Sequence, residues 1–210
     1  LDIVKDRKDI WIFSDECYEQ LTYDVPFKSI ATFKPELDKI ITFQSCSKTY
    51  AMTGWRIGYL AGNIDLVKAI SKLQGQSTSC PNSIAQYAAI EALIGDQSCV
   101  RDMKATFHKR RDLILHELNK IAKISCEKPN GAFYVFPYIG KYLNTKTPTG
   151  QLVKTSSELS LYILAMTGVV TVSGDSFGAP NYIRLSYATS DKIIVEACKL
   201  INEALGKLNF

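Results

Sequence analysis

The chain has 210 residues, of which 46% are hydrophobic and 22% charged, an ordinary composition for a globular protein with a sizeable core. Its net charge of +4 comes from 25 basic residues scattered among 21 acidic ones, which argues against a nucleic-acid partner. No apolar run approaches the roughly 20 residues that cross a bilayer, so we expect no membrane association. The six cysteines form no Cys-x-x-Cys pair and no signal peptide is visible, which predicts a cytoplasmic protein without a metal site.

Three short apolar runs in the first third of the chain predict β-strands. Runs of this length that are rich in β-branched and aromatic residues are typical of strands buried on both faces. The three predicted strands cover residues 9–13, 38–43 and 56–62.

Three helices are expected next. Helical spacing of apolar residues predicts the first over residues 65–73. The second is strongly apolar, starts with a cap near Asn82 or Ser83 and ends at Gly95. The third is a long amphipathic helix from about residue 98 to 123, whose basic run from His108 to Arg111 predicts a solvated face.

The second half of the chain alternates less regularly between strands and helices. It predicts strands at 131–139, 169–174 and 181–188, a polar loop at 140–151, and helices at 155–168 and 191–208. The pattern favours an α/β fold in the first half and a smaller α+β arrangement in the second. We therefore predict two domains, residues 1–100 and 101–210, with the long helix leading into the second.

Polar, potentially reactive side chains follow the first two predicted strands. Asp15 and Tyr18 follow one strand, and Ser45, Ser47 and Lys48 follow the next. In open α/β sheets, ligands bind at the carboxyl ends of the strands. If the two strands are neighbours, these groups converge on one crevice.

The side chains of this crevice would suit a single kind of ligand. A desolvated lysine amine can lose its proton and then react with an aldehyde, which makes Lys48 a candidate nucleophile. The hydroxyls of Ser45 and Ser47, together with the guanidinium of Arg56, suit a phosphate group. These four residues predict a site for a phosphorylated aldehyde.

The two acidic groups of the set complete the description. A carboxylate such as Asp15 could keep a pyridine nitrogen protonated, and the phenol of Tyr18 could donate to a phenolate oxygen. An aldehyde, a phosphate, a pyridine nitrogen and a phenolate together describe pyridoxal 5'-phosphate.

Four motifs in the order and spacing of a known family span nearly the whole chain. They are "SDECYE", "SCSKTYAMTGWRIGY", "GAFYVFP" and "GDSFGAPNYIRLSYA". The chain resembles the C-terminal half of a class I pyridoxal-phosphate-dependent aminotransferase of fold type I, within the bacterial-type aspartate or aspartate/prephenate aminotransferase subgroup. The resemblance implies part of a large transferase domain with a mostly parallel sheet, followed by a smaller α+β domain.

The resemblance also implies roles for individual residues. Lys48 corresponds to the lysine that forms a Schiff base with the cofactor and shuttles the substrate's proton. Asp15 corresponds to the acid paired with the pyridine nitrogen, and Tyr18 to the phenol bonded to the phenolic oxygen.

Further correspondences concern the phosphate and the substrate. Ser45, Ser47 and Arg56 match the family's phosphate ligands, and Arg184 matches the arginine that binds the substrate α-carboxylate. The segment at Phe177 resembles a mobile segment that lines the substrate pocket.

The sequence departs from the family pattern in two respects. Ser173 stands where proline is common, which puts the stiffness of that loop in doubt. The chain also opens without Met, and the family's N-terminal half, with its cofactor loop, side-chain pocket and much of the dimer interface, has no counterpart. We therefore expect a piece of a longer homodimeric enzyme that is weakly active or inactive by itself.

The predicted reaction is amino-group transfer between an L-amino acid, with aspartate as first candidate, and a 2-oxo acid, with 2-oxoglutarate as first candidate. Two alternatives remain open at this point. One is a different pyridoxal-phosphate reaction on the same scaffold, such as a β-lyase reaction. The other is a non-catalytic fragment or regulator module built on this fold.

Overall fold

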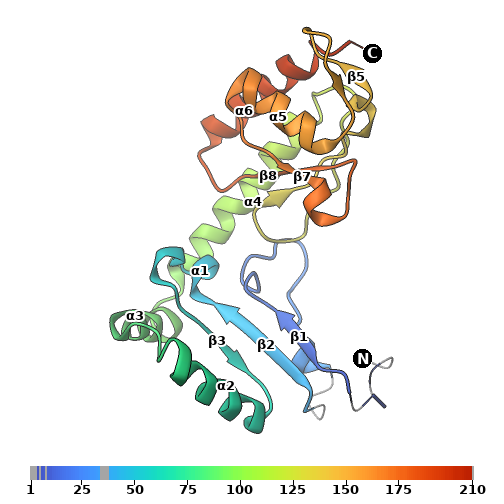
Figure 1. The fold of residues 1–210 in the computed structure, drawn as a ribbon. Helices are drawn as coiled ribbons and strands as arrows, with labels where there is room; N and C mark the ends of the chain where they lie inside the picture. The colour runs from blue at the N-terminus through green and yellow to red at the C-terminus, as the bar shows by residue number, and fades with distance from the viewer. Residues whose placement is uncertain (1–3, 5, 8, 34–37, 210) are drawn as a thin grey trace. The chain divides into compact units, whose positions relative to one another are not determined.

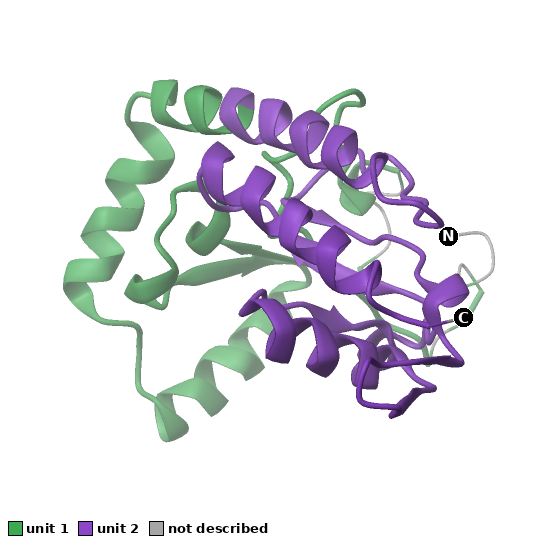
Figure 2. Ribbon diagram, turned by 90° about the horizontal axis from the view of Figure 1, so that it is seen from above, with its two compact units in different colours: residues 1–104 green, residues 105–210 purple. Residues whose placement is uncertain are grey.

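The computed structural model describes residues 4, 6, 7, 9–33 and 38–209. Its helices and strands are shown in Figure 1. The chain divides into two compact units, residues 1–104 and 105–210, which Figure 2 distinguishes by colour. Each unit combines helices with a sheet, in agreement with the predicted α/β class. The assignment of residues 1–100 and 101–210 to a large and a small domain stays a prediction.

The sheet of unit 1 contains three strands in the order β1-β2-β3. β1 (Ile12–Asp15) and β2 (Ile40–Ser45) run parallel, and β3 (Gly58–Ala61) runs antiparallel to β2. β1 and β2 end two residues beyond the predicted strands, because backbone pairing continues into the polar residues that follow each apolar run. Asp15 and Ser45 are therefore the last residues of their strands.

Close approach of β3 to β2 depends on Gly58. A Cβ atom at this position would lie 2.7 Å from the carbonyl oxygen of Gln44, a backbone atom that cannot move aside cheaply. Gly58 thus allows the strand after Arg56 to pair tightly beside the end of β2.

The helices of unit 1 begin with α1 (Cys46–Thr49), a single turn directly after β2 that the sequence did not predict. A 3₁₀ turn over Thr53–Trp55 and the helices α2 (Ile64–Ser77) and α3 (Ser83–Ile94) follow. The caps predicted for α3 are confirmed: the side chain of Asn82 accepts from the backbone at its start, and Gly95 is its C-cap.

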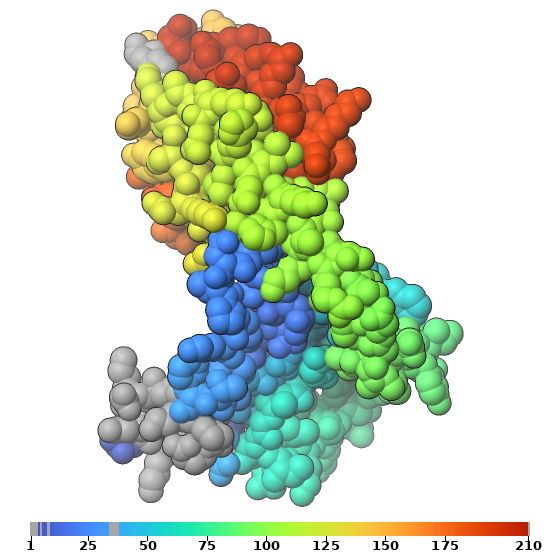
Figure 3. All heavy atoms as spheres, turned by 180° about the vertical axis from the view of Figure 1, so that it is seen from behind, coloured from blue at the N-terminus to red at the C-terminus, as the bar shows by residue number. Residues whose placement is uncertain are grey.

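The core of unit 1 is small. Buried Cys46, Met52 and Ala89 pack together, so that α3 is held to the segment after β2 through its alanine face. The other side of α3 carries exposed apolar side chains, namely Ile84, Tyr87, Ile90, Leu93 and Ile94. Helices α2 and α3, teal to green in Figure 3, form an outer surface of this unit.

Unit 2 is entered along α4 (Ser98–Leu118), which ends five residues before its predicted end at residue 123. Its other elements are β4 (Tyr134–Val135), β5 (Thr145–Lys146), β6 (Leu152–Val153), α5 (Ser156–Thr167), β7 (Val172–Ser173), β8 (Ile183–Ser186) and α6 (Asp191–Leu205). β8 lies between β4 and β7 in an antiparallel sheet, and β5 pairs with β6.

The predicted strand 131–139 is reduced to the two residues of β4. Ala132 adopts a positive φ of 58°, which bends the chain before the strand. Pro137 follows the strand and has no N–H to contribute to a ladder. The predicted loop 140–151 is also partly ordered into strands, because β5 lies within it and pairs with β6 immediately beyond it.

A contiguous apolar core fills unit 2. Its fully buried side chains include Ile139, Leu159, Ile163, Ile183 and Leu205.

The interpretation of the basic run His108–Arg111 as a solvated face is wrong for Arg111, which is 0% exposed. Its Nε donates to Asp112 over 2.9 Å and its Nη1 to the carbonyl oxygen of Pro129 over 3.2 Å. Burial is possible because these partners offset the desolvation of the guanidinium.

Candidate active site

The carboxyl ends of β1 and β2 lie at one edge of the sheet of unit 1. The two strands are parallel, and Asp15 at the end of β1 is opposite Phe43 of β2. Lys48 follows β2 within α1, three residues beyond Ser45. The Asp15 side chain is exposed and that of Lys48 half-buried, so both are accessible at this edge.

The thiol of Cys17 is a neighbour of both groups. Burial and the hydrogen bond to Asp15 raise its pKa to about 11, and the negative charge of Asp15 adds to this effect. The positive charge of Lys48 acts on the same thiol in the opposite direction. Because one half-buried group responds to both charges, Asp15 and Lys48 belong to one local environment.

Tyr18 lies on the turn that follows β1. The turn is closed by a hydrogen bond of 2.9 Å from the Leu21 N–H to the Tyr18 carbonyl oxygen, and the Leu21 side chain is fully buried. The side chain of Tyr18 is half-buried. The turn therefore holds the phenol on the segment that also carries Asp15 and Cys17.

The three predicted phosphate ligands lie where β2 ends and β3 begins. Ser45 is opposite Gly58, so the antiparallel pairing brings Arg56, two residues earlier than Gly58, beside the end of β2. The Ser45 hydroxyl caps α1 by accepting from the Ser47 N–H over 3.1 Å. Arg56 has a left-handed backbone, with φ 54°, and one of its guanidinium N–H groups donates to the Thr53 carbonyl oxygen over 3.0 Å.

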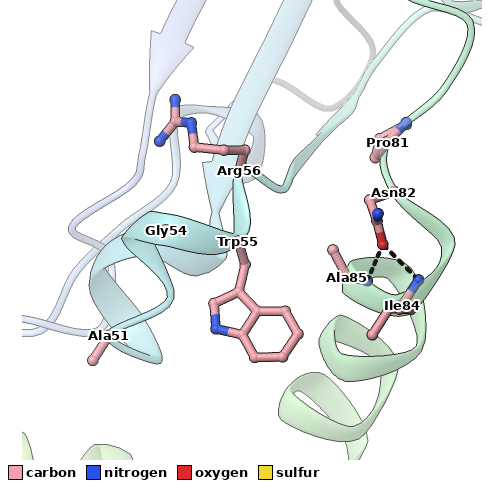
Figure 4. Close-up of a pocket in the computed structure, with 8 residues that line it drawn as sticks. All are labelled: Ala51, Gly54, Trp55, Arg56, Pro81, Asn82, Ile84 and Ala85. Carbon is pink, nitrogen blue, oxygen red and sulfur yellow. Dashed lines mark hydrogen bonds between the residues drawn. The ribbon is translucent and has the colours of Figure 1, made fainter.

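A cavity of about 650 Å³ opens on the other side of Arg56 (Figure 4). It is lined by Trp55, Pro81 and the first turn of α3. The Arg56 guanidinium points away from Trp55 and from Asn82, whose carboxamide is occupied with capping α3. Arg56 is itself one of the residues that line this cavity, together with Ala51 and Gly54 of the segment between β2 and β3.

Arg184 belongs to unit 2 and lies on β8, the central strand of its sheet. Its neighbours in sequence, Ile183 and Leu185, face the core, so Arg184 points to the opposite face. The guanidinium carbon lies 4.5 Å from the ring centroid of Tyr134 and 4.7 Å from that of Phe177. Two rings that pack against the guanidinium restrict its rotation and leave its edge for a planar anion.

Glu16 is a buried carboxylate beside Asp15 that was not among the predicted site residues. It is 3% exposed, and one carboxylate oxygen accepts from the Ser29 hydroxyl over 3.0 Å and the Ile30 N–H over 3.2 Å. The other oxygen accepts from the Gln44 side chain over 3.4 Å. The signal was available, because alternation along a strand places Asp15 and Glu16 on opposite faces.

The donor set in unit 1 fits pyridoxal phosphate. A carboxylate, a phenol and an amine at the ends of β1 and β2 match its pyridine nitrogen, phenolic oxygen and aldehyde, and the hydroxyls with Arg56 match its phosphate. Within the described part of the chain, no three His, Cys, Asp or Glu side chains are grouped as a metal site would require.

None of the described helices is both long and apolar enough to cross a membrane.

Comparison with known proteins gives the same family for nearly the whole chain. A family model described as aminotransferase class I and II matches residues 1–201. A probable aspartate/prephenate aminotransferase of Rhizobium leguminosarum is 42% identical over 207 residues, which is 98% of this chain and 52% of the relative. An aspartate/prephenate aminotransferase of Cereibacter sphaeroides is 42% identical over 91% of this chain and 48% of its own.

Two solved structures that are similar to this chain are also aminotransferases. The crystal structure of the aspartate aminotransferase of Rhizobium meliloti has a TM-score of 0.91 and 40% identity, over 95% of this chain and 50% of that one. An aromatic aminotransferase of Pyrococcus horikoshii has a TM-score of 0.87 and 34% identity, over 98% and 53%.

The fold and the family match define the class of the protein: this chain belongs to the class I and II aminotransferases, a family that depends on pyridoxal phosphate. Its relatives include the aspartate/prephenate aminotransferases named above. The chain spans about half the length of the curated relatives it matches.

Proposed function

We propose that the protein transfers an amino group between an L-amino acid, with aspartate as first candidate, and a 2-oxo acid, with 2-oxoglutarate as first candidate. Pyridoxal phosphate, held at Lys48, supplies the electron sink for this chemistry when it is bound. The observation that carries the proposal is the position of Asp15 and Lys48 at the same edge of a parallel strand pair, where both act on the thiol of Cys17.

Each residue of the edge has a distinct task in this proposal. The Lys48 amine would hold the cofactor covalently until the amino group of the substrate displaces it. The freed Nζ could then accept the proton from the substrate Cα and return it to the cofactor. The Asp15 carboxylate holds the proton on the pyridine nitrogen, and the Tyr18 hydroxyl donates to the phenolic oxygen. Arg184 binds the substrate α-carboxylate in a bidentate manner.

The phosphate is held by hydroxyl and guanidinium groups. The short segment between β2 and β3 keeps Ser45, Ser47 and Arg56 near one another, which supports their role as its ligands. Arg56 and the two hydroxyls would hold the phosphate of the cofactor, and a guanidinium can do so with two parallel hydrogen bonds.

The names of the relatives suggest a further candidate substrate. Several of them are named aspartate/prephenate aminotransferase, so prephenate is a second candidate amino acceptor. We further propose that the protein acts as a homodimer in the cytoplasm, as the family resemblance implies.

An assay of the longer protein that contains this chain, purified with pyridoxal phosphate, tests the proposal, because the 210 residues by themselves are expected to be weakly active or inactive. Aspartate with 2-oxoglutarate, or with prephenate, should yield the amino form of the acceptor, while a β-lyase would release ammonia from its substrate without needing an acceptor. Lys48→Ala should lower the transfer rate by roughly 10²- to 10⁴-fold or more. Lys39→Ala, a change of another lysine in the same unit, should leave it unchanged.

Two results would overturn the proposal. One is ammonia release with no dependence on an acceptor, which would favour the lyase. The other is an unchanged transfer rate in Lys48→Ala, which would remove Lys48 from the chemistry. A protein that transfers no amino group from any amino acid tested would support the non-catalytic alternative.

A further inference from the structure

Four side chains in unit 2 form a hydrogen-bonded group that we call the Ser–Asp cluster: Ser156, Ser157, Ser173 and Asp175. Ser156 and Ser157 belong to the first turn of α5, whereas Ser173 ends β7 and Asp175 lies in the 3₁₀ turn η4 (Gly174–Phe177). The cluster therefore joins the start of a helix to the segment that carries Phe177.

The hydroxyl of Ser173 is at the centre of the cluster. Its oxygen lies 2.8 Å from that of buried Ser156 and 2.9 Å from that of Ser157, and it accepts from the Asp175 N–H over 3.1 Å. The Ser173 hydroxyl donates to Asp175 Oδ2 over 3.0 Å. Asp175 Oδ2 also accepts from the Ser157 hydroxyl over 2.8 Å and from the Ser157 N–H over 3.3 Å.

Each hydroxyl proton of the Ser–Asp cluster can be assigned to one acceptor. Ser156 donates its one hydroxyl proton to Ser173, and Ser173 and Ser157 each donate theirs to the carboxylate of Asp175. The three hydroxyl protons thus have acceptors, and the charged acceptor makes two of the bonds stronger than neutral ones. Removing Ser173 takes away the hydroxyl that contacts Ser156, Ser157 and Asp175 at once.

The rest of η4 is tightly packed against the segment that leads into β8. The Gly174 N–H donates to the Tyr182 carbonyl oxygen over 2.8 Å, and the Gly174 carbonyl oxygen accepts from the Ala179 N–H over 2.9 Å. A Cβ atom at position 174 would collide with the carbonyl oxygens of Ala179 and Tyr182. The backbone at the start of η4 therefore has one arrangement that fits.

The position of the Phe177 ring depends on the backbone conformation of η4. The Phe177 side chain is 49% exposed, so burial alone does not fix it, and its contacts are an edge-to-face packing with Phe136 and the stack on Arg184. A change in η4 would move the Phe177 ring and remove one of the two rings that hold the guanidinium of Arg184.

We propose that the Ser–Asp cluster positions Arg184 for carboxylate binding by holding η4, and with it Phe177, in place. This inference rests on the proposed role of Arg184 and makes Ser173 and Asp175 positioning residues. The hydrogen bonds of the cluster restrict the backbone at position 173, as a proline there would do through its fixed φ. Ser173 has a φ of −59°, a value that proline adopts without strain, and it is Gly174 rather than Ser173 that donates to Tyr182.

Variants of the longer protein that contains this chain, loaded with pyridoxal phosphate, test the inference. Succinate serves as a non-reactive dicarboxylate probe for its Kd by calorimetry, and KM and kcat are measured with aspartate. Ser173→Ala should raise the succinate Kd and the KM roughly fivefold to tenfold, as loss of one or two hydrogen bonds predicts, with kcat within about twofold. Ser157→Ala, an exposed position that keeps the protein folded, should change both constants in the same direction.

Two control variants separate positioning from general damage. Ser176→Ala makes the same chemical change in η4 outside the cluster and should leave the Kd within about twofold. Ser173→Pro removes the hydroxyl but fixes φ, and it should restore the parent Kd.

The outcomes are distinguishable. If Ser173→Ala and Ser157→Ala bind succinate as the parent does while Arg184→Ala loses binding, the positioning role is overturned and the role of Arg184 stands. If Arg184→Ala itself binds succinate normally, the proposed substrate role fails and the inference fails with it. A Ser173→Pro variant as weak as Ser173→Ala would also contradict the inference, because rigidity would then not be the cause.

Discussion

Cys17 reports on the charges at the ends of β1 and β2. With a pKa of about 11, roughly one thiol in a thousand is ionised at pH 8, which makes alkylation slow. The thiolate is negative, so the Asp15 carboxylate disfavours it and the Lys48 ammonium favours it. Substitutions of these two residues should therefore change the reactivity of Cys17 in opposite directions.

The cofactor-free full chain tests this prediction with iodoacetamide at pH 8 and peptide mass spectrometry. Asp15→Asn should lower the pKa of Cys17 and speed its alkylation several-fold, and Lys48→Met should slow it. Exposed Cys80 and Cys99 serve as internal references whose rates should not change. Equal Cys17 rates in all three proteins would mean that the thiol does not share an environment with Asp15 and Lys48.

At the scale of elements, Glu16 links the end of β1 to the turn at Ser29 and to β2. Glu16→Ala would leave the partly buried donors of Ser29, Ile30 and Gln44 without this acceptor. We expect a loss of about 3 kcal/mol in the free energy of unfolding, measured by urea denaturation.

Glu19→Ala is the matched control for this change. Glu19 lies three residues further along the same segment, and its removal should cost less than about 0.5 kcal/mol. If the two variants were equally stable, the carboxylate of Glu16 would not hold these elements together.

Helices were the most predictable elements because their end signals are local. The Asn82 cap, Gly95 and Gly168 mark the limits of α3 and α5 where the sequence expected them. The short strands were less predictable, because two-residue ladders such as β4 and β5 depend on partners distant in sequence. Turn α1, which carries Lys48, has too few residues for any helical periodicity to show.

At the scale of the whole molecule, the motif order predicted the family, and the comparisons confirm it. The roles of the polar residues after β1 and β2 stay a prediction. The burial of Arg111 could not be predicted, since it depends on the loop that brings Pro129 to it, and the partners of Glu16 likewise depend on the loop that carries Ser29. The Ser–Asp cluster was equally out of reach, because its serines and Asp175 meet only when η4 packs beside α5.

The two units differ in how completely they bury apolar surface. Unit 2 has a contiguous core, whereas unit 1 has three buried residues in its cluster and leaves Phe13 of β1 and the preceding Trp11 exposed. The candidate cofactor residues lie in the unit with the smaller core. The most direct test of the account is therefore made on the full chain rather than on unit 1 alone.

That test is the position of the covalent cofactor bond. The full chain is incubated with pyridoxal phosphate, reduced with borohydride, digested and mapped by mass spectrometry. We expect a cofactor label on Lys48, no label in a folded Lys48→Met variant, and an unchanged label in Lys39→Met. A label on another lysine, or one that persists in Lys48→Met, would contradict the claim that Lys48 holds the cofactor beside Asp15.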